Sequence, residues 1–304
     1  MRGEVETPGD WEALGYRCDD PSNIIRWADI SDGGSGSSFA FSGNKKAAVL
    51  VAGEGLLNIS ESTVNGSSDA GIELEANANL GRFFVNVFDN NGGPGMRVYP
   101  RHLVQLDSAT TYGGRGGNEN GDAWIDVTDG STSQTTLNVD VSGTWKGTDV
   151  PYRFEKRAAI LSSVQIDIDR GARFLMSPGS GISVDGTLNF NGASPDSGIV
   201  VTRESESAGS WEALVFQGGS SSTMRYTTVE YGGSGADFEF SGNGRANIFV
   251  RDNASFDILT STIQNSAEIG LLLRDGAVVN PLNPVLSGAN TFEGNAMNVK
   301  DERP

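Results

Sequence analysis

The feature that most constrains this chain is a stretch of sequence that occurs twice. Residues 11–51 and residues 211–250 both open with Trp-Glu-Ala-Leu, then share Gly-Gly-Ser-Gly and Phe-x-Phe-Ser-Gly-Asn. The first Phe of the last motif is Phe39 in one copy and Phe238 in the other, 199 positions apart. A match of this order and length predicts a repeat protein, in which stacked units share one continuous core.

The match continues with weaker similarity beyond the second copy. The further pairs are Leu57–Ile59 with Asp257–Ile258, Ser62–Asn65 with Ser261–Gln264, Gly71–Leu74 with Gly270–Leu273, Phe88–Asn91 with Phe292–Asn295, and Met96–Val98 with Met297–Val299. The repeat unit is therefore about 200 residues long. The chain divides into a polar lead-in (1–10), the second half of a unit (11–98), linking coils with a Gly/Asn-rich loop (99–144), one long unit (145–299) and a charged tail (300–304).

Short bursts of β-branched and aromatic residues are separated by Gly, Asn, Asp and Ser, which predicts strands and turns. No segment has a sustained helical period with caps, so we expect almost no long helix. The loop expected to protrude is 110–122. The predicted strands are 24–25, 27–30, 47–51, 56–59, 71–74, 82–88, 98–106, 123–127, 135–141, 158–161, 164–168, 173–176, 182–184, 188–190 and 199–202.

Turns this short leave no room for crossover helices between the strands. A solenoid needs only that the chain keep winding, with each strand beside its counterpart one coil further on. We therefore expect an all-β parallel solenoid of about a dozen coils, if each coil takes roughly 20–25 residues.

The second half of the chain resembles a known family of folds. It is similar to the right-handed parallel β-helix of pectate-lyase-like repeat proteins, in particular to uncharacterised surface or secreted ones. The residues that carry the resemblance are Trp145 with Val150–Tyr152, Val164–Phe174, Gly181–Leu188, Ile199–Thr202, Gly209–Leu214 and Met224–Gly233. The resemblance implies a right-handed parallel β-helix.

Enzymes of the resembled fold cleave acidic polysaccharides, the lyases with Arg or Lys and calcium, the hydrolases with clustered Asp. Asp126, in Ala-Trp-Ile-Asp-Val, lies where a lyase motif has Asp followed by His, but here Val127 follows. Asp19 and Asp20 are paired acids without a flanking motif. They are catalytic candidates, and the alternatives are an exposed strand residue for Asp126 and a solvated turn for the pair.

His102 is the only histidine and Cys18 the only cysteine. These counts exclude a disulfide within the chain and any zinc site or mechanism that needs two histidines. We expect His102 to lie on an exposed corner.

Calcium is the cofactor considered first, although the fold requires none. Asn118, Asn120, Asp122 and Asp89 offer oxygen ligands in Gly-containing loops. The alternative is that these residues were selected for turn geometry.

Aromatic residues recur at matched positions in the two copies. They are Trp27, Tyr226, Tyr231, Phe39 and Phe238. Stacking in the core explains the recurrence best; an exposed ladder that stacks on sugar rings is the alternative.

The net charge is −17, from 39 acidic and 22 basic residues. A field of this sign repels nucleic acid and anionic membranes. No apolar run is long enough to insert into a membrane, and residues 1–10 lack the apolar core of a signal peptide. An acidic, Lys-poor surface fits a high-salt habitat or an ordinary secreted protein.

The predicted function is non-enzymatic. We expect a segment of an exported or cell-surface protein that acts as a rigid scaffold or binds a polysaccharide or another surface protein. The alternative is a polysaccharide lyase or glycoside hydrolase acting from the outer groove. It is less favoured because no cluster of Asp with Arg or Lys appears with family spacing.

Overall fold

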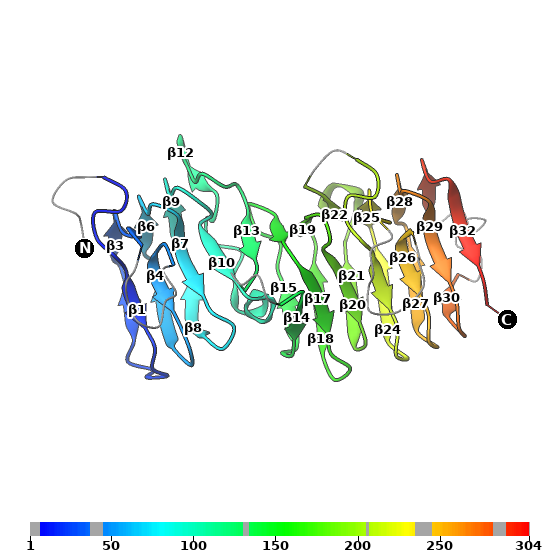
Figure 1. Ribbon diagram of the computed structural model, residues 1–304, viewed down its shortest axis with the longest axis horizontal. Helices are drawn as coiled ribbons and strands as arrows, with labels where there is room; N and C mark the ends of the chain where they lie inside the picture. The colour runs from blue at the N-terminus through cyan, green and yellow to red at the C-terminus, as the bar shows by residue number, and fades with distance from the viewer. Residues whose placement is uncertain are drawn as a thin grey trace. The chain divides into compact units, whose positions relative to one another are not determined.

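The computed structural model describes residues 7–36, 45–129, 134–204, 207–234, 245–281 and 290–303. Two compact units divide the chain: unit 1 is Met1–Ser131 with Thr148–Tyr152, and unit 2 is Thr132–Gly147 with Arg153–Pro304. Figure 1 shows that both consist mainly of short strands. The Phe-x-Phe-Ser-Gly-Asn motifs, with Phe39 and Phe238, lie outside the described residues.

Unit 1 winds through three parallel sheets. Consecutive strands along the chain belong to different sheets, and within each sheet a strand pairs with the strand from the preceding coil. The sheets are β1 (Leu14–Tyr16), β4 (Ala47–Val51), β7 (Ala70–Leu74), β10 (Met96–Val98) and β13 (Ile125–Val127); β2 (Ile24–Arg26), β5 (Leu56–Ser60) and β8 (Asn79–Phe84); β3 (Asp29–Ser31), β6 (Thr63–Asn65) and β9 (Val87–Asp89).

Unit 2 repeats this arrangement with longer sheets. Its strands are β14 (Thr136–Val139), β17 (Arg157–Ile160), β20 (Gly181–Val184), β23 (Leu214–Phe216), β26 (Ala246–Val250), β29 (Ile269–Leu273) and β32 (Met297–Asp301); β15 (Gly143–Trp145), β18 (Gln165–Asp169), β21 (Thr187–Asn191), β24 (Ser221–Arg225), β27 (Ser255–Leu259) and β30 (Val278–Asn280); β16 (Tyr152–Phe154), β19 (Arg173–Met176), β22 (Ile199–Arg203), β25 (Thr227–Glu230), β28 (Thr262–Gln264) and β31 (Thr291–Glu293). The predicted all-β parallel β-helix is confirmed.

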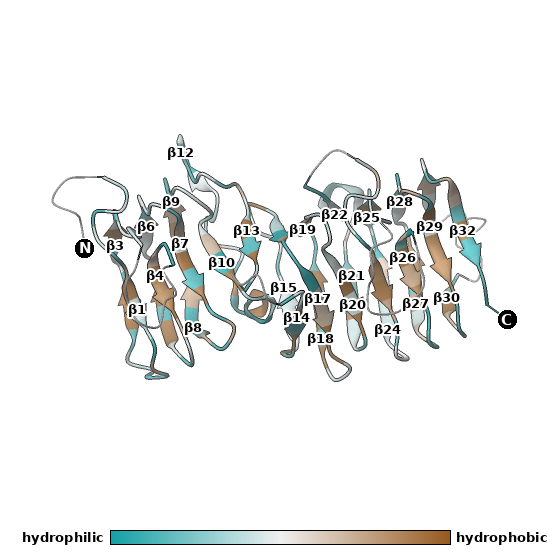
Figure 2. Cartoon of the chain, viewed as in Figure 1, coloured by the Kyte–Doolittle hydropathy of each residue, from teal (hydrophilic) through white to brown (hydrophobic). Residues whose placement is uncertain are grey.

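The interior of each unit is a set of apolar columns. One column runs through Ile168, Phe190, Met224 and Ile258, which are Cα partners on successive strands and are fully buried. In Figure 2 the strands carry most of the hydrophobic colour. Stacking like side chains coil over coil removes apolar surface from water without any helix.

The described parts of the two copies share the contacts of their opening tryptophan. Trp11 donates its indole N–H to the carbonyl of Ser31 at 2.7 Å, and Trp211 donates to Glu230 at 2.9 Å. Each indole lies against a glycine: a Cβ added at Gly33 would be 2.8 Å from the Trp11 ring. The glycine motif is therefore required by the tryptophan that opens each copy.

Asparagine ladders repeat as well. The Asn91 side chain accepts the Ser67 N–H and donates to the Val64 carbonyl, and Asn295 does the same for Ser266 and Ile263 in unit 2. These bonds satisfy buried backbone groups at the corners, where no sheet partner exists.

The structure corrects the last pair of the sequence match. Ile72 of β7 pairs with Met96, while Leu271, its counterpart 199 residues on, pairs with Val299. Met96 therefore corresponds to Val299 rather than to Met297. Strand β32 also continues to Asp301, so the predicted charged tail begins within a strand.

Two other predictions were wrong in detail. Residues 98–106 are not a strand; β10 ends at Val98, and a 3₁₀ helix (Pro100–Gln105, η1) follows because Pro100 fits its first turn. The predicted strand 82–88 is divided by a corner at Val85. The predicted 110–122 loop is not contradicted, and within it the structure has an antiparallel hairpin, β11 (Gly114–Arg115) with β12 (Asn118–Glu119).

Left-handed residues make the corners of the coils. The corner between β2 and β3 is Trp27, with φ 52°, and its counterpart between β24 and β25 is Tyr226, with φ 45°. The same corner is left-handed on other coils, at Glu61, Val85 and Thr260, so the conformation belongs to the turn. The aromatic side chain is what distinguishes Trp27 and Tyr226.

Candidate functional site

An open groove of about 430 Å³ lies on the outer face of unit 2, and we call it the Tyr226 groove. Its floor is a row of outward-facing residues on four adjacent strands: Arg173 of β19, Val200 of β22, Thr228 of β25 and Thr262 of β28 are successive Cα partners. The other lining residues are Gly171, Pro195, Asp196, Gly198, Ile199, Tyr226, Thr227 and Thr260.

The side of the groove is formed by a corner and a loop. A short 3₁₀ helix, η2 (Pro195–Ser197), occupies the loop between β21 and β22. Glycines allow this loop to approach Tyr226, because a Cβ at Gly192 or Gly198 would lie 2.6 or 2.7 Å from the Tyr226 carbonyl oxygen. Tyr226 is half-buried and is one of the residues that line the groove.

A polar ladder runs along the same outer face, two residues further along each strand. The Glu230 carboxylate accepts hydrogen bonds from Thr202 at 2.7 Å and from Gln264 at 2.6 Å. At the next corner the Arg203 guanidinium lies 3.2 Å from the centroid of the Tyr231 ring. These contacts link three strands and fix the face beside the groove.

The groove combines the groups that bind a polyhydroxylated ligand. It offers one aromatic ring, threonine side chains, an exposed cation at Arg173 and an exposed carboxylate at Asp196. Aromatic rings give apolar contact, and a few polar groups fix orientation. Its lining includes no cysteine or histidine that could act as a nucleophile or as a base.

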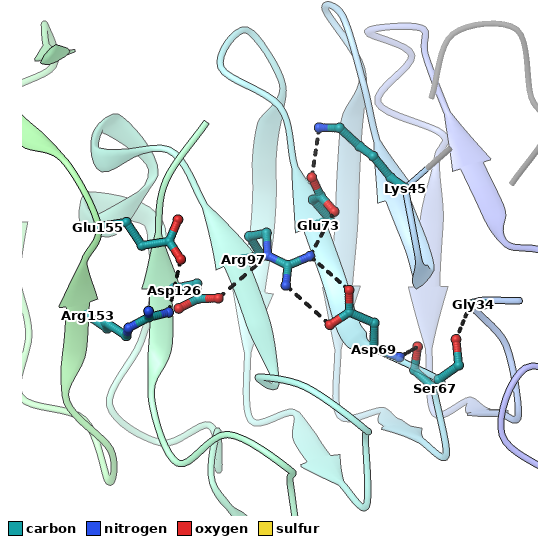
Figure 3. A network of polar contacts seen from close by, with 10 residues as sticks. Gly34, Lys45, Ser67, Asp69, Glu73, Arg97, Asp126, Arg153 and Glu155 are labelled. Carbon is teal, nitrogen blue, oxygen red and sulfur yellow. Dashed lines mark hydrogen bonds and ion pairs between the residues drawn. The ribbon is translucent and has the colours of Figure 1, made fainter. Parts of the chain in front are cut away.

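A second candidate, the Arg97 cluster, lies on the outer face of unit 1. It consists of Lys45, Asp69, Glu73, Arg97 and Asp126. Arg97 of β10 is the Cα partner of Glu73 on β7 and of Asp126 on β13. Figure 3 shows the guanidinium between the three carboxylates.

The cluster is an ion-pair network. Arg97 donates to both Asp69 oxygens at 3.2 Å and lies 3.4 Å from a Glu73 oxygen and 3.6 Å from an Asp126 oxygen. Lys45 contacts Glu73 at 2.7 Å. Burial lowers the pKa of Arg97, but the hydrogen bonds from Arg97 to Asp69 and the nearby carboxylates outweigh burial and raise it. Arg97 therefore stays cationic and cannot act as a base.

The carboxylates at the centre of this cluster are too buried for a substrate to reach them. The Glu73 and Asp126 side chains are each only 4% exposed. The prediction that Asp126 is an exposed strand residue was wrong. Sequence spacing could not reveal the cluster, because its members lie on separate coils that only the register brings together.

The corresponding place in unit 2 keeps only part of the charge. Leu272 is the counterpart of Glu73, and its Cα partner on β32 is Lys300, which corresponds to Arg97. Lys300 contacts Glu302 at 2.6 Å, and on its other side Leu272 pairs with Phe249 in a buried apolar cluster. The basic residue therefore recurs, but the buried carboxylate of Glu73 does not.

The structure places the paired acids Asp19 and Asp20 on an exposed turn. The Ser22 N–H donates to Asp20 Oδ1 at 2.8 Å, and this hydrogen bond lowers the pKa of Asp20. An acid at position 20 therefore stabilises the turn, as the solvated-turn alternative expects.

The calcium candidates are used differently by the fold. The Asn120 amide is buried: its oxygen accepts the Asn91 N–H, and its nitrogen donates to Phe88 and Tyr112. Asn118 is exposed on the hairpin, and the backbone of Asp122 forms an isolated parallel β-bridge with Pro94. Burial raises the pKa of Asp89 on β9. Within the described ranges no three His, Cys, Asp or Glu side chains are grouped to hold a metal.

His102 is buried, not on an exposed corner, so this prediction was wrong. Its Nδ1 accepts the Tyr99 N–H at 3.2 Å, so Nε2 carries the proton and donates to the Ala78 carbonyl at 2.8 Å. Burial lowers the pKa of His102 to about 4. The ring is a neutral structural bridge between η1 and the chain before β8.

The repeated aromatics are not core residues where the structure describes them. Trp27 is 72% exposed, and Tyr226 and Tyr231 are half-buried. The expectation of core stacking was wrong for Trp27, because matched positions in a solenoid include its corners as well as its interior columns.

Comparisons with family models, with curated proteins and with solved structures give no match to this chain. In the part of the chain that the structure describes, no helix has the length and apolar character needed to cross a membrane.

Proposed function

We propose that this protein is a non-enzymatic β-helical scaffold that binds a polysaccharide chain in the Tyr226 groove. The observation that carries the proposal is a half-exposed tyrosine, held at a left-handed corner beside a row of outward-facing threonines. As polysaccharides are abundant outside cells, we also propose that the protein is exported or displayed on a cell surface.

The groove is preorganised for a ligand. Its floor strands β22 and β25 are each paired on both sides. The backbone of Tyr226 is held at its corner, and the loop carrying Gly192 and Gly198 packs closely against its carbonyl. Little conformational freedom is lost when a ligand binds such a surface, which favours affinity.

Polysaccharide cleavage is the weaker candidate. A hydrolase or lyase needs carboxylates and a base that touch the substrate. The acid–arginine cluster of unit 1 instead has its central carboxylates buried and paired with Arg97. Release of reducing ends or unsaturated sugars by the native protein, abolished by Asp126→Ala, would establish the enzymatic alternative.

The charge of the molecule bears on the ligand. A net charge of −17 disfavours polyanions, while Arg173 in the groove offers one local cation. Binding should therefore be measured with neutral hexasaccharides of glucose and xylose and with hexagalacturonate, by isothermal titration calorimetry.

Tyr226→Asn is the decisive variant. Asparagine tolerates the left-handed corner, so the substitution removes the ring and keeps the backbone. We expect about tenfold weaker binding, since a stacked aromatic contact contributes roughly 1.5 kcal/mol.

The threonine row offers a matched pair of variants. Thr228→Val removes a hydroxyl inside the groove, and Thr291→Val removes one in the same row on β31, which is outside the lining residues. Weaker binding in the first variant alone supports the proposal. Equal binding by the native protein, Tyr226→Asn and Thr228→Val would refute it.

A further inference from the structure

Trp27 occupies the same corner in the first copy of the repeat that Tyr226 occupies in the second. Both residues have a left-handed backbone conformation, and each separates a strand of the second sheet from a strand of the third. The outward partners also correspond: Asp29 and Thr63 of unit 1 stand where Thr228 and Thr262 line the groove of unit 2.

The indole at this corner is open to solvent on one face. The Arg26 guanidinium lies 4.0 Å from the ring centroid, and Arg26 is held there by Glu61 at 2.7 Å. The tryptophan is nevertheless 72% exposed. Since one face is covered by Arg26, the exposed area must include the opposite face.

The core does not require an indole at this position. The adjacent inward side chains, Ile25 and Ile30, are buried, whereas Trp27 is 72% exposed. The left-handed backbone belongs to the turn, because the same corner on other coils has it at Glu61, Val85 and Thr260. The exposed indole is the feature that the turn does not require. An exposed aromatic ring offers an apolar face to a ligand.

We propose that Trp27 is a second saccharide-binding platform, which takes the apolar face of a neutral sugar ring. This inference rests on the proposed function, because it extends the same ligand class to the equivalent corner of unit 1. Arg26 on the ring, Glu61 paired with Arg26, and Asp29 at the start of β3 offer donors and acceptors for sugar hydroxyls near this corner. The balanced ion pair and the neighbouring acid favour a neutral sugar, and the charge of −17 opposes nucleic-acid bases.

The test is the stoichiometry and the tryptophan fluorescence of binding to neutral hexasaccharides of glucose and xylose. Trp27 is more exposed than the buried Trp145 and Trp211 and than the partly buried Trp11 and Trp124. We expect two sites per native chain, and protection of one fluorescent component from acrylamide when saccharide binds. Trp27→Asn should remove one site and that protected component, whereas Trp27→Phe should keep the site.

The outcomes separate this inference from the proposed function. One site per native chain, unchanged in Trp27→Asn and lost in Tyr226→Asn, overturns the inference alone. Binding lost in Trp27→Asn and unchanged in Tyr226→Asn supports the platform and overturns the groove. Absence of binding to either saccharide overturns the platform. Melting temperatures of the two asparagine variants within a few degrees of the native value establish that both are folded.

Discussion

Acidification should destabilise this protein through its single histidine. His102 is buried and neutral, with a pKa of about 4 against 6.5 for an unperturbed histidine. Between these two pH values the unfolded chain binds a proton that the folded protein does not. The stabilisation is therefore complete above pH 6.5 and is lost as the pH falls toward 4.

The magnitude follows from the two pKa values. Each pH unit between 6.5 and about 4 lowers the free energy of unfolding by up to about 1.4 kcal/mol, or about 3 kcal/mol in all. Carboxylates titrate in the same range, so the histidine contribution must be isolated by a variant. His102→Gln serves, because glutamine can also accept one hydrogen bond and donate another.

The assay is urea unfolding of the native protein and of His102→Gln at several pH values from 7.5 to 4. The difference in free energy of unfolding, native minus variant, should fall by about 3 kcal/mol across this range. A difference that stays constant would mean that His102 titrates normally in the folded state, and the burial argument would be wrong.

Two further predictions concern the repeated contacts. Asn86→Ala should lower the free energy of unfolding by about 1–3 kcal/mol, because it leaves the buried Ser62 N–H and Ile59 carbonyl without side-chain partners. Asn290→Ala, at the less buried equivalent corner, should lower it by less. Equal losses in the two variants would contradict this ranking. Glu212→Gln should lower the free energy of unfolding, measured with urea, by about 3 kcal/mol. The Arg157 guanidinium, which lies 2.5 and 2.7 Å from the carboxylate oxygens, loses its countercharge. A double variant with Arg157→Met should recover part of the loss, and no recovery would show that the pair does not act as a unit.

The repeat and the strand punctuation were enough to predict the fold. In the described residues the duplicated sequence makes matching contacts down to single hydrogen bonds, such as those from Trp11 and Trp211. Strands 47–51 and 173–176 were predicted to the residue, because β-branched and aromatic runs there end at clear turn residues.

The candidate sites were harder to predict, for physical reasons. The Arg97 cluster depends on which residues become neighbours across coils, and coil lengths vary, so spacing along the chain does not reveal it. His102 was misplaced because its burial follows from the 3₁₀ helix that Pro100 starts. The exposed corners were missed because recurrence at Trp27 and Tyr226 looks the same for a corner as for a core column.

The central claim is that coils stack in register along one axis in unit 2, which is what builds the groove. Gln165, Thr187, Ser221, Ser255 and Val278 occupy one outward row of five successive strands. In a Cys18→Ser background, spin labels at Gln165 and one other member of the row can be measured by continuous-wave and pulsed electron paramagnetic resonance. The distance should increase by about 4.8 Å for each coil, to about 19 Å at Val278; distances that do not rise steadily along the row would contradict the stacking and the groove built on it.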